Sequence, residues 1–159
     1  MKVKNIIDED FCNYKEPSMF IGFPKCTFKC ELECPDCHCQ NKGLAVSPDI
    51  EVDAASICER YINNPITKAI VCGGLEPFDT FDSLYRLISV LRTTYSCTDP
   101  IIIYTGYTFS ELTEKLSWLM NFPNIIVKVG RYQPNGKHHI DNILGIELSS
   151  ENQYALKVS

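Results

Sequence analysis

The segment AIVCGGLEPFDTFDSLYRLISVLRTTYSCTDPIIIY, residues 69–104, contains two apolar stretches separated by an amphipathic one. The apolar stretches at 69–72 and 101–104 are almost continuous, which is typical of strands buried on both faces of a parallel sheet. Residues 81–94 are predicted to be helical because their apolar side chains recur at helical spacing: Leu84, Leu87, Ile88 and Leu91. The order of strand, helix and strand predicts a parallel strand pair with a helical crossover.

The same alternation continues on both sides of this unit. Further apolar strands are predicted at 18–23 and 125–129, with further helices at 53–63 and after residue 108. A complete eight-stranded barrel typically needs at least ~200 residues. The sequence therefore predicts an α/β fold with a partial, open (βα) barrel, mainly parallel strands, and functional loops at the carboxyl ends of the strands. Residues from 130 onward show little periodicity and are expected to lie across an edge of the sheet.

The helix starts are marked by capping residues. Asp53 is expected to cap the first helix, and Thr80 or Asp79 the second. Thr108 and Glu111, three residues apart, predict a capping box at the start of the third. Residues 24 to about 47 are expected to form a loop.

The composition favours one domain without nucleic-acid or membrane partners. The 159 residues fit a single domain, 1–159, and their 45% hydrophobic content is enough to bury one core. A formal net charge of -5, with scattered Lys and Arg, argues against a nucleic-acid binder. The first residues, MKVKNIIDEDF, lack the apolar run of a signal peptide or membrane span. A cytoplasmic location is expected, where clustered thiols are available as metal-binding thiolates because disulfides are disfavoured.

The segment CTFKCELECPDCHCQN, residues 26–41, indicates a metal site because it holds five cysteines: Cys26, Cys30, Cys34, Cys37 and Cys39. Three thiolates can hold three irons of a four-iron cluster and leave the fourth iron open to a ligand. Two triplets are possible. Cys30, Cys34 and Cys37 give the spacing CxxxCxxC, whereas Cys26, Cys30 and Cys39 give CxxxCx8C.

Two other interpretations of this segment are open at this point. A structural zinc site could use any four of the cysteines, with or without His38. The residues Cys34-Pro35-Asp36-Cys37 have the CPxC form of thioredoxin-like proteins. That motif should open a helix after a strand, whereas here it lies inside a charged loop, which disfavours the redox interpretation.

The strand ends carry the other candidate residues. Gly73 and Gly74 would let a ligand approach the backbone closely, and Glu76 supplies a carboxylate for an ammonium group. Taken alone, this segment is better explained by an ordinary strand-to-helix turn. Residues 104–112, YTGYTFSEL, end the next strand and begin a helix. Two basic residues flank the end of the last strand, where they could meet a carboxylate or be solvated: Lys128 and Arg131.

The conjunction of the cysteine segment with Gly-Gly-x-Glu-Pro one strand later resembles the radical S-adenosylmethionine enzymes. The string TGYTFSEL, residues 105–112, resembles the equivalent strand end in the activating enzymes of anaerobic (class III) ribonucleotide reductase. Residues 149–153, SSENQ, are similar to the SSNQ tail of that group, with Glu151 as an apparent insertion. The wide spacing before the third cysteine is the other departure. The resemblance covers nearly the whole chain, with the motifs in the expected order.

The resemblance implies two cofactors. Cys26, Cys30 and Cys39 would hold a [4Fe-4S] cluster, because Cys39-Gln40-Asn41 resembles the cysteine-x-asparagine ending of the activases; Cys34 and Cys37 are the alternative ligands. The methionine end of S-adenosylmethionine would be held by three residues after the second strand: Gly73, Gly74 and Glu76. Further residues would lie beside the cluster or line the same cavity: Gln40, Asn41, Thr105, Gly106 and Tyr107.

The resemblance also implies an activity and partners. One electron would cleave S-adenosylmethionine to methionine and a 5'-deoxyadenosyl radical, which would generate a glycyl radical on a large partner, the anaerobic ribonucleotide reductase catalytic subunit. Flavodoxin or ferredoxin would be the electron donor. The size of the chain agrees with a macromolecular substrate, because little sequence is left for a lid over a small molecule. The rival functions are a radical enzyme acting on a small molecule or peptide and a zinc-binding interaction module.

Overall fold

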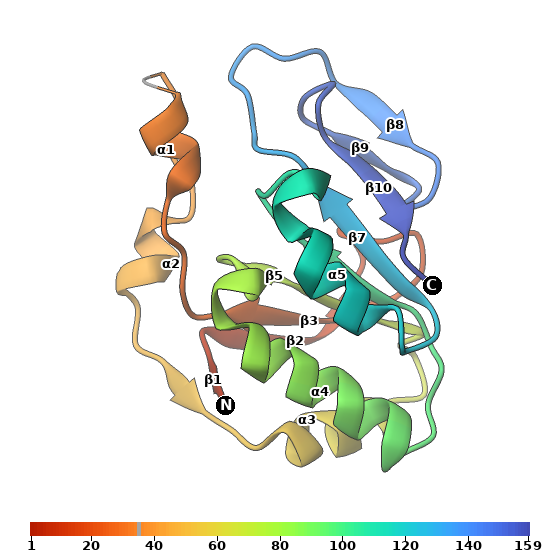
Figure 1. The fold of residues 1–159 in the computed structure, drawn as a ribbon. Coiled ribbons are helices and arrows are strands. Elements are labelled where there is room, and N and C mark those ends of the chain that lie inside the picture. The colour runs from red at the N-terminus through yellow and green to blue at the C-terminus, as the bar shows by residue number, and fades with distance from the viewer. Residues whose placement is uncertain (35) are drawn as a thin grey trace.

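The computed structural model describes residues 1–34 and 36–159 (Figure 1). The strands are β1 Lys2–Val3, β2 Asn5–Asp10, β3 Ser18–Phe23, β4 Ile50–Glu51, β5 Ala69–Gly74, β6 Ile101–Tyr104, β7 Ile125–Val129, β8 His139–Asp141, β9 Ile146–Leu148 and β10 Tyr154–Lys157. The helices are α1 Lys29–Glu33, α2 Lys42–Val46, α3 Ala54–Ile62, α4 Phe81–Thr93 and α5 Thr113–Leu119, with 3-10 turns at Pro77–Thr80 and Phe109–Leu112.

Six strands form the central sheet, in the order β10-β7-β6-β5-β3-β2. The four inner strands, β3, β5, β6 and β7, are parallel to one another, as predicted. The edge strands β2 and β10 each run antiparallel to their neighbour. The structure is therefore mixed α/β with a mostly parallel sheet, and its curvature into a partial barrel stays a prediction.

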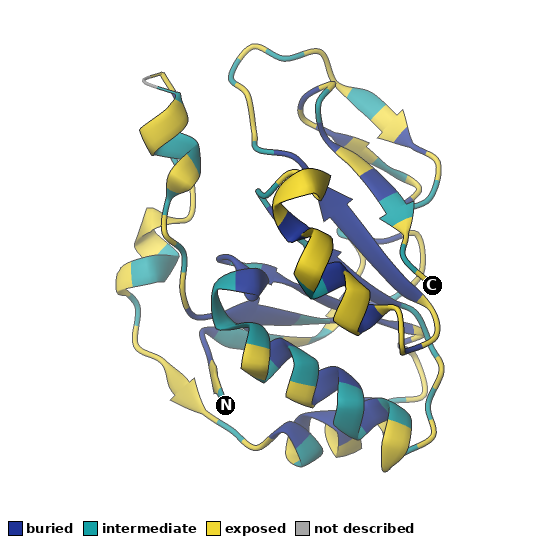
Figure 2. Ribbon diagram, viewed as in Figure 1, coloured by how far each residue is buried: buried dark blue, intermediate teal, exposed yellow. Residues whose placement is uncertain are grey.

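The main core lies between the sheet and the helices α3, α4 and α5, which cover one face of the sheet (Figure 1). Alternate residues of each strand point to this face because successive side chains of a strand point to opposite sides. The predicted apolar positions of α4 are fully buried in this core: Leu84, Leu87, Ile88 and Leu91. Figure 2 shows the outer faces of the same helices as exposed, which explains their amphipathic sequence.

The opposite face of the sheet carries a second, smaller core. Val71, Ile102 and Ile126 pack there against Leu144 and Leu148, which belong to the segment around the β8–β9 hairpin. Both faces of the inner strands are therefore buried, in agreement with their continuous apolar sequences. Within the described residues, no helix is both long and apolar enough to cross a membrane.

Several details differ from the sequence prediction. The loop expected at 24–47 contains the two five-residue helices α1 and α2. Thr80 precedes α4, but its side chain makes no capping hydrogen bond, whereas Asp53 caps α3 as expected by accepting from the Ala55 amide. The Thr108–Glu111 capping box is present and opens a 3-10 turn that continues into α5. The tail extends one edge of the sheet through β10.

Candidate functional site

The start of the cysteine segment is held against the loop that follows β5. The Lys25 carbonyl accepts a hydrogen bond from the Glu76 amide at 2.8 Å. The Thr27 amide donates to Asp79 Oδ2 at 2.7 Å, and the other oxygen of Asp79 accepts from the Tyr107 hydroxyl at 2.6 Å. Asp79, considered above as a helix cap, thus joins the loops that follow β3, β5 and β6.

Three cysteines of the segment are free thiols: Cys26, Cys30 and Cys39. Cys26 Sγ accepts a hydrogen bond from the Phe28 amide at 3.3 Å, and Cys39 Sγ accepts from the Asn41 amide at 3.4 Å. Hydrogen bonds of this kind favour the thiolate, which is the form that binds metal. Glu31 fixes the far end of the segment, since it accepts from the Cys39 amide at 2.6 Å and pairs with Lys42 at 2.8 Å.

The remaining two cysteines of the segment, Cys34 and Cys37, form a disulfide with a Cα–Cα distance of 5.2 Å. The expectation that all clustered thiols stay unpaired is therefore wrong for this pair. The physical reason is a tight turn, in which the Cys37 amide donates to the Cys34 carbonyl and brings the two Cα atoms within the range of disulfides. The CPxC interpretation also involves Pro35, which lies outside the described residues.

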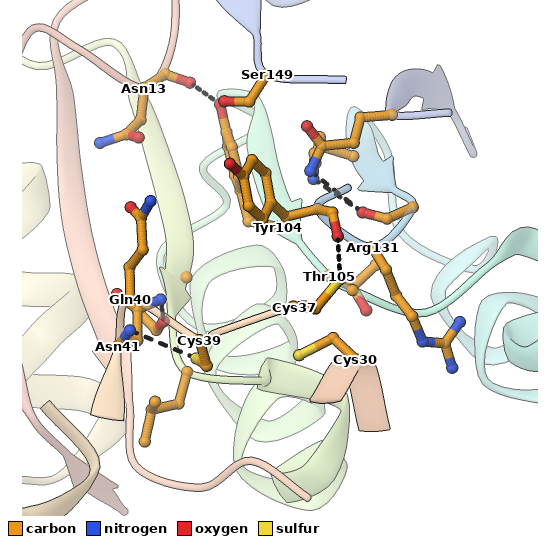
Figure 3. A pocket seen from close by; sticks show the side chains of 18 of the residues that line it. Asn13, Cys30, Cys37, Cys39, Gln40, Asn41, Tyr104, Thr105, Arg131 and Ser149 are labelled. Atoms are coloured by element: carbon orange, nitrogen blue, oxygen red, sulfur yellow. Dashed lines mark hydrogen bonds between the residues drawn. The ribbon is translucent and has the colours of Figure 1, made fainter. Parts of the chain in front are cut away.

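A cavity of ≈ 450 Å³ lies at the carboxyl ends of the parallel strands (Figure 3). Most of the predicted site residues line it: Cys30, Cys37, Cys39, Gln40, Asn41, Gly73, Gly74, Thr105 and Gly106. Figure 3 shows Cys30, Cys37 and Cys39 at one end of the cavity, which we call the cysteine end. Asn13, Tyr104 and Ser149 lie at the other end, which we call the tail end. Residues from distant parts of the sequence, from Asn13 to Gln153, therefore meet around one space.

Cys26, Glu76 and Tyr107 line a smaller neighbouring cavity of ≈ 40 Å³. It shares Cys30, Gly106 and Arg131 with the large one. Glu76 is only 6% exposed, and burial raises its pKa to about 7. Its carboxylate accepts from the Phe78 amide at 3.2 Å and from the Gly106 amide at 2.9 Å. Each carboxylate oxygen thus already has one backbone donor, and a ligand ammonium would have to use the remaining lone pairs.

The glycine pair at the end of β5 is required by packing. A Cβ atom at Gly73 would lie 3.1 Å from the Phe20 ring. Gly74 has a φ of 80°, and a Cβ atom there would lie 3.0 Å from Gly22 Cα on the neighbouring strand. Asn41 Nδ2 donates to the Gly74 carbonyl at 2.7 Å, which links the end of the cysteine segment to this strand. The absence of side chains also leaves the strand end open toward the cavity.

The Cys30 thiol interacts electrostatically with both of the other free thiols, those of Cys26 and Cys39. Burial, helped by the charges of Glu76, Asp79 and Cys30 and opposed by the Phe28 hydrogen bond, raises the pKa of Cys26 to about 11. Burial, followed by the charge of Cys39, raises the pKa of Cys30. Both thiols are therefore protonated at neutral pH, and binding of iron would displace their protons.

The three free thiols supply the kind of ligands that hold an iron-sulfur cluster. Among residues 1–34 and 36–159, no three His, Cys, Asp or Glu side chains are placed to hold one metal ion. In an iron-sulfur cluster each thiolate binds a different iron, so the sulfur atoms must stand apart by the width of the cluster. Cys26 lines the small cavity, Cys39 the large one and Cys30 both.

The cavity also has a wall that was not identified from the sequence. Phe20, Tyr104, Lys128, Ser149 and Gln153 all line it. For Lys128 the sequence left open a contact with a carboxylate or a solvated position, and the second alternative is wrong because Lys128 is buried within β7. The sequence does contain a sign of this burial, because Lys128 is the single polar residue in the otherwise apolar strand IIVKV.

Arg131 joins the cysteine segment to the ends of β6 and β7. Its guanidinium donates to both carboxylate oxygens of Glu111, at 3.0 and 2.8 Å, and pairs with Glu33 of α1 at 3.1 Å. The hydrogen bonds from Arg131 hold the pKa of Glu111 well below its usual range. Lys29 of α1 adds a further contact to Glu111 at 3.3 Å.

A Glu111→Gln variant is expected to unfold at a midpoint about 2–4 °C lower at neutral pH, the shift that ~1 kcal/mol gives in a chain of this size. Because the folded-state pKa of Glu111 is depressed, its contribution is present above the unfolded value near 4.5 and is lost as the pH falls. The difference between the two proteins should therefore shrink below about pH 4.5. Thermal melts from pH 3 to 8 measure this, and a difference independent of pH would contradict it.

Comparison with known proteins gives one match. A family model described as a 4Fe-4S single cluster domain matches residues 23–154, which include every cysteine of the cysteine segment and all lining residues of the two cavities except Asn13 and Phe20. No curated protein and no solved structure matches the chain. The match supports a [4Fe-4S] cluster as cofactor and agrees with a redox role. Because it extends over most of the sequence, the chain belongs to the 4Fe-4S single cluster domain family.

Proposed function

We propose that the chain is a radical S-adenosylmethionine protein, which cleaves this cofactor reductively and generates a glycyl radical on a partner, the catalytic subunit of anaerobic ribonucleotide reductase. One observation carries the proposal. In a chain of a 4Fe-4S family, the free thiols of Cys30 and Cys39 meet the ends of β5 and β6 at a single cavity. Its volume of ≈ 450 Å³ lies within the range of roughly 300–1,000 Å³ that is typical of small-ligand sites.

Cys26, Cys30 and Cys39 would hold the cluster. When bound, the cluster supplies the single electron that splits the sulfonium into methionine and a 5'-deoxyadenosyl radical. The protein contributes the backbone amides of Phe28 and Asn41, which already donate to two of the sulfur atoms. It also keeps the other two cysteines of the segment, Cys34 and Cys37, occupied with each other.

The ends of β5 and β6 would hold S-adenosylmethionine. Gly73 and Gly74 leave the backbone open, and the Gly74 carbonyl is oriented by Asn41 Nδ2. Glu76 lies in the loop after β5, and burial raises its pKa to about 7. The positive charge of an ammonium group bound beside it would favour the ionised carboxylate. Thr105 is fixed because its hydroxyl accepts from the Tyr107 amide at 3.0 Å. These groups would orient the ligand and exclude water.

Two exposed side chains support a macromolecular partner. Leu32 is 80% exposed on α1, inside the cysteine segment, and Val46 is 87% exposed on α2, directly after it. Burial of such side chains against a partner would contribute to binding. A partner bound there could present a flexible loop to the cavity, since a glycine inside a sheet would not reach it.

The test is chemical and anaerobic. The protein is reconstituted with iron and sulfide, reduced with flavodoxin or ferredoxin, and given S-adenosylmethionine, and 5'-deoxyadenosine is measured by chromatography. The proposal predicts its formation together with methionine. Addition of the reductase subunit should then produce a glycyl radical signal in electron paramagnetic resonance.

Other outcomes separate the rival functions. A colourless protein that contains zinc and no sulfide would overturn the proposal in favour of an interaction module. Formation of 5'-deoxyadenosine with turnover of a small molecule, and no radical on the reductase subunit, would keep the radical chemistry and reject the partner. An intact cluster that never cleaves S-adenosylmethionine, even with the subunit present, would reject the radical chemistry itself.

A further inference from the structure

Lys128 lies on β7 with its side chain on the face of the sheet that the large helices leave free. Its neighbours in the strand, Val127 and Val129, belong to the core under those helices, so Lys128 points the opposite way. In the sheet it pairs directly with Tyr104, and its ammonium lies 6.0 Å from the centroid of the Tyr104 ring. Both residues line the large cavity, and Lys128 as a whole is only 7% exposed.

The ammonium of Lys128 has few partners for a buried charge. The ammonium donates one hydrogen bond, to the Gly130 carbonyl at 3.1 Å. No carboxylate in residues 1–34 and 36–159 forms an ion pair with it. Lys4 is the other buried lysine among these residues, and its ammonium group is fully compensated by partners within the fold. Its ammonium donates to the carbonyls of Ala45 and Ser47 and pairs with Asp49 at 2.9 Å.

Burial costs an ammonium group several kcal/mol unless an opposite charge compensates. Burial lowers the pKa of Lys128 to about 8, and the charge of Glu76 opposes this shift. Lys128 is therefore mostly charged at neutral pH. The protein thus maintains a positive charge at the wall of a cavity without a counter-charge beside it.

The described lining of the cavity also lacks acidic side chains. None of its described residues is Asp or Glu, although the chain carries a formal net charge of -5. The only other charged basic side chain in the lining, Arg131, is paired with Glu111 and Glu33. The tail end adds the Ser149 side chain and the amide of Gln153, whose Nε2 donates to the same Gly130 carbonyl at 3.4 Å.

We infer that the tail end of the cavity is a subsite for a carboxylate, with Lys128 as its cation. One lysine balances the single charge of a carboxylate, whereas a phosphate with about two charges would leave a buried excess of negative charge. The carboxylate comes either from S-adenosylmethionine, in which case the subsite rests on the proposed function, or from a second ligand such as the substrate. The ring of Tyr104 is fixed beside it, because its hydroxyl donates to the Asn13 carbonyl at 2.6 Å.

Three variants test the subsite: Lys128→Met, Lys128→Arg, and the matched control Lys115→Met. Lys115 also donates to one backbone carbonyl, that of Phe78 at 2.6 Å, and lies 5.7 Å from an aromatic ring, but it does not line the cavity. Binding of S-adenosylmethionine and of its decarboxylated analogue is measured by anaerobic calorimetry. The NMR signal of the Lys128 ammonium, assigned by its loss in Lys128→Met, is followed during titration with acetate against chloride at equal ionic strength.

We expect acetate, and not chloride, to shift the Lys128 signal. If S-adenosylmethionine displaces the acetate, the cofactor supplies the carboxylate, and Lys128→Met should weaken its binding about 30-fold or more while leaving the decarboxylated analogue unaffected. If acetate stays bound beside S-adenosylmethionine, the carboxylate belongs to a second ligand. Lys128→Arg should retain part of the effect, and Lys115→Met should show none.

Stability gives a second readout. Because an uncompensated buried charge is removed, Lys128→Met without ligand should be at least as stable as the natural protein, whereas a purely structural lysine would lose stability on substitution. A signal that ignores acetate, with both forms of S-adenosylmethionine bound equally well by all variants, would overturn the subsite. Failure of the natural protein to bind S-adenosylmethionine, with acetate still shifting Lys128, would instead reject the proposed function and leave the subsite standing.

Discussion

Cys39→Ala is expected to abolish retention of the iron-sulfur cluster, whereas Cys37→Ala is expected to preserve it. Cys39 is a free thiol at the cysteine end of the cavity, and its sulfur accepts a hydrogen bond from the Asn41 amide. Cys37 is joined to Cys34 in a disulfide. Removing one of three ligands leaves an iron without its thiolate, and clusters are held by these bonds. Iron and sulfide content after anaerobic reconstitution measures the result.

The control for this experiment is the double variant Cys34→Ala/Cys37→Ala. It removes the disulfide without leaving an unpaired thiol, and it should load iron as the natural protein does. Cys30→Ala should fail to load in either case, because Cys30 belongs to both candidate triplets. Loading by Cys39→Ala together with loss in Cys37→Ala would assign the cluster to Cys30, Cys34 and Cys37 instead.

Gly130→Ala is expected to destabilise the protein by about 3 kcal/mol, through strain at a positive φ and collision with the tail. Gly130 has a φ of 97°, and an added Cβ atom would collide with the Asn152 carbonyl oxygen and lie 3.1 Å from Gln153 Cα. The Gly130 carbonyl is also the acceptor for Lys128 and Gln153. The unfolding midpoint should fall by roughly 6–12 °C, which a thermal melt measures.

Gly43→Ala provides the matched control. Gly43 lies inside α2, and a Cβ atom there would meet nothing within 4 Å. Since alanine favours a helix over glycine by up to ~1 kcal/mol, this variant should be as stable as the natural protein or slightly more stable. A Gly130→Ala protein with an unchanged midpoint would mean that the tail does not pack against the end of β7 as described.

The strands and helices that the sequence predicted best are those with a sustained pattern of apolar residues. The four apolar strands bury nearly all of their residues, and α4 buries its predicted positions Leu84, Leu87, Ile88 and Leu91, so the local pattern and the tertiary packing agree. The helices α1 and α2 were missed because each has five residues, none of them buried. Distant polar contacts hold them in place, such as the bonds from Lys4 to the carbonyls of Ala45 and Ser47.

The candidate site was predictable where residues follow strands directly. Gly73, Gly74, Thr105 and Gly106 line the cavity because the carboxyl ends of parallel strands meet at one edge. Glu76 was assigned to a ligand ammonium. Of its two backbone donors, the Phe78 amide is local, whereas the Gly106 amide comes from the next strand end, and no local pattern reveals that contact. The contributions of Lys128 and of the tail depend on how the chain returns to the sheet.

The walls of the cavity come from widely separated parts of the chain, with Asn13 and Phe20 early, the cysteines next, and Ser149 and Gln153 late. During synthesis the cysteines therefore leave the ribosome long before the residues that enclose the space beside them. Until β10 has joined β7, a nascent chain would expose its thiols to oxidation and to stray metal ions. We expect the cell to deliver iron and sulfide to the finished chain, after translation has ended.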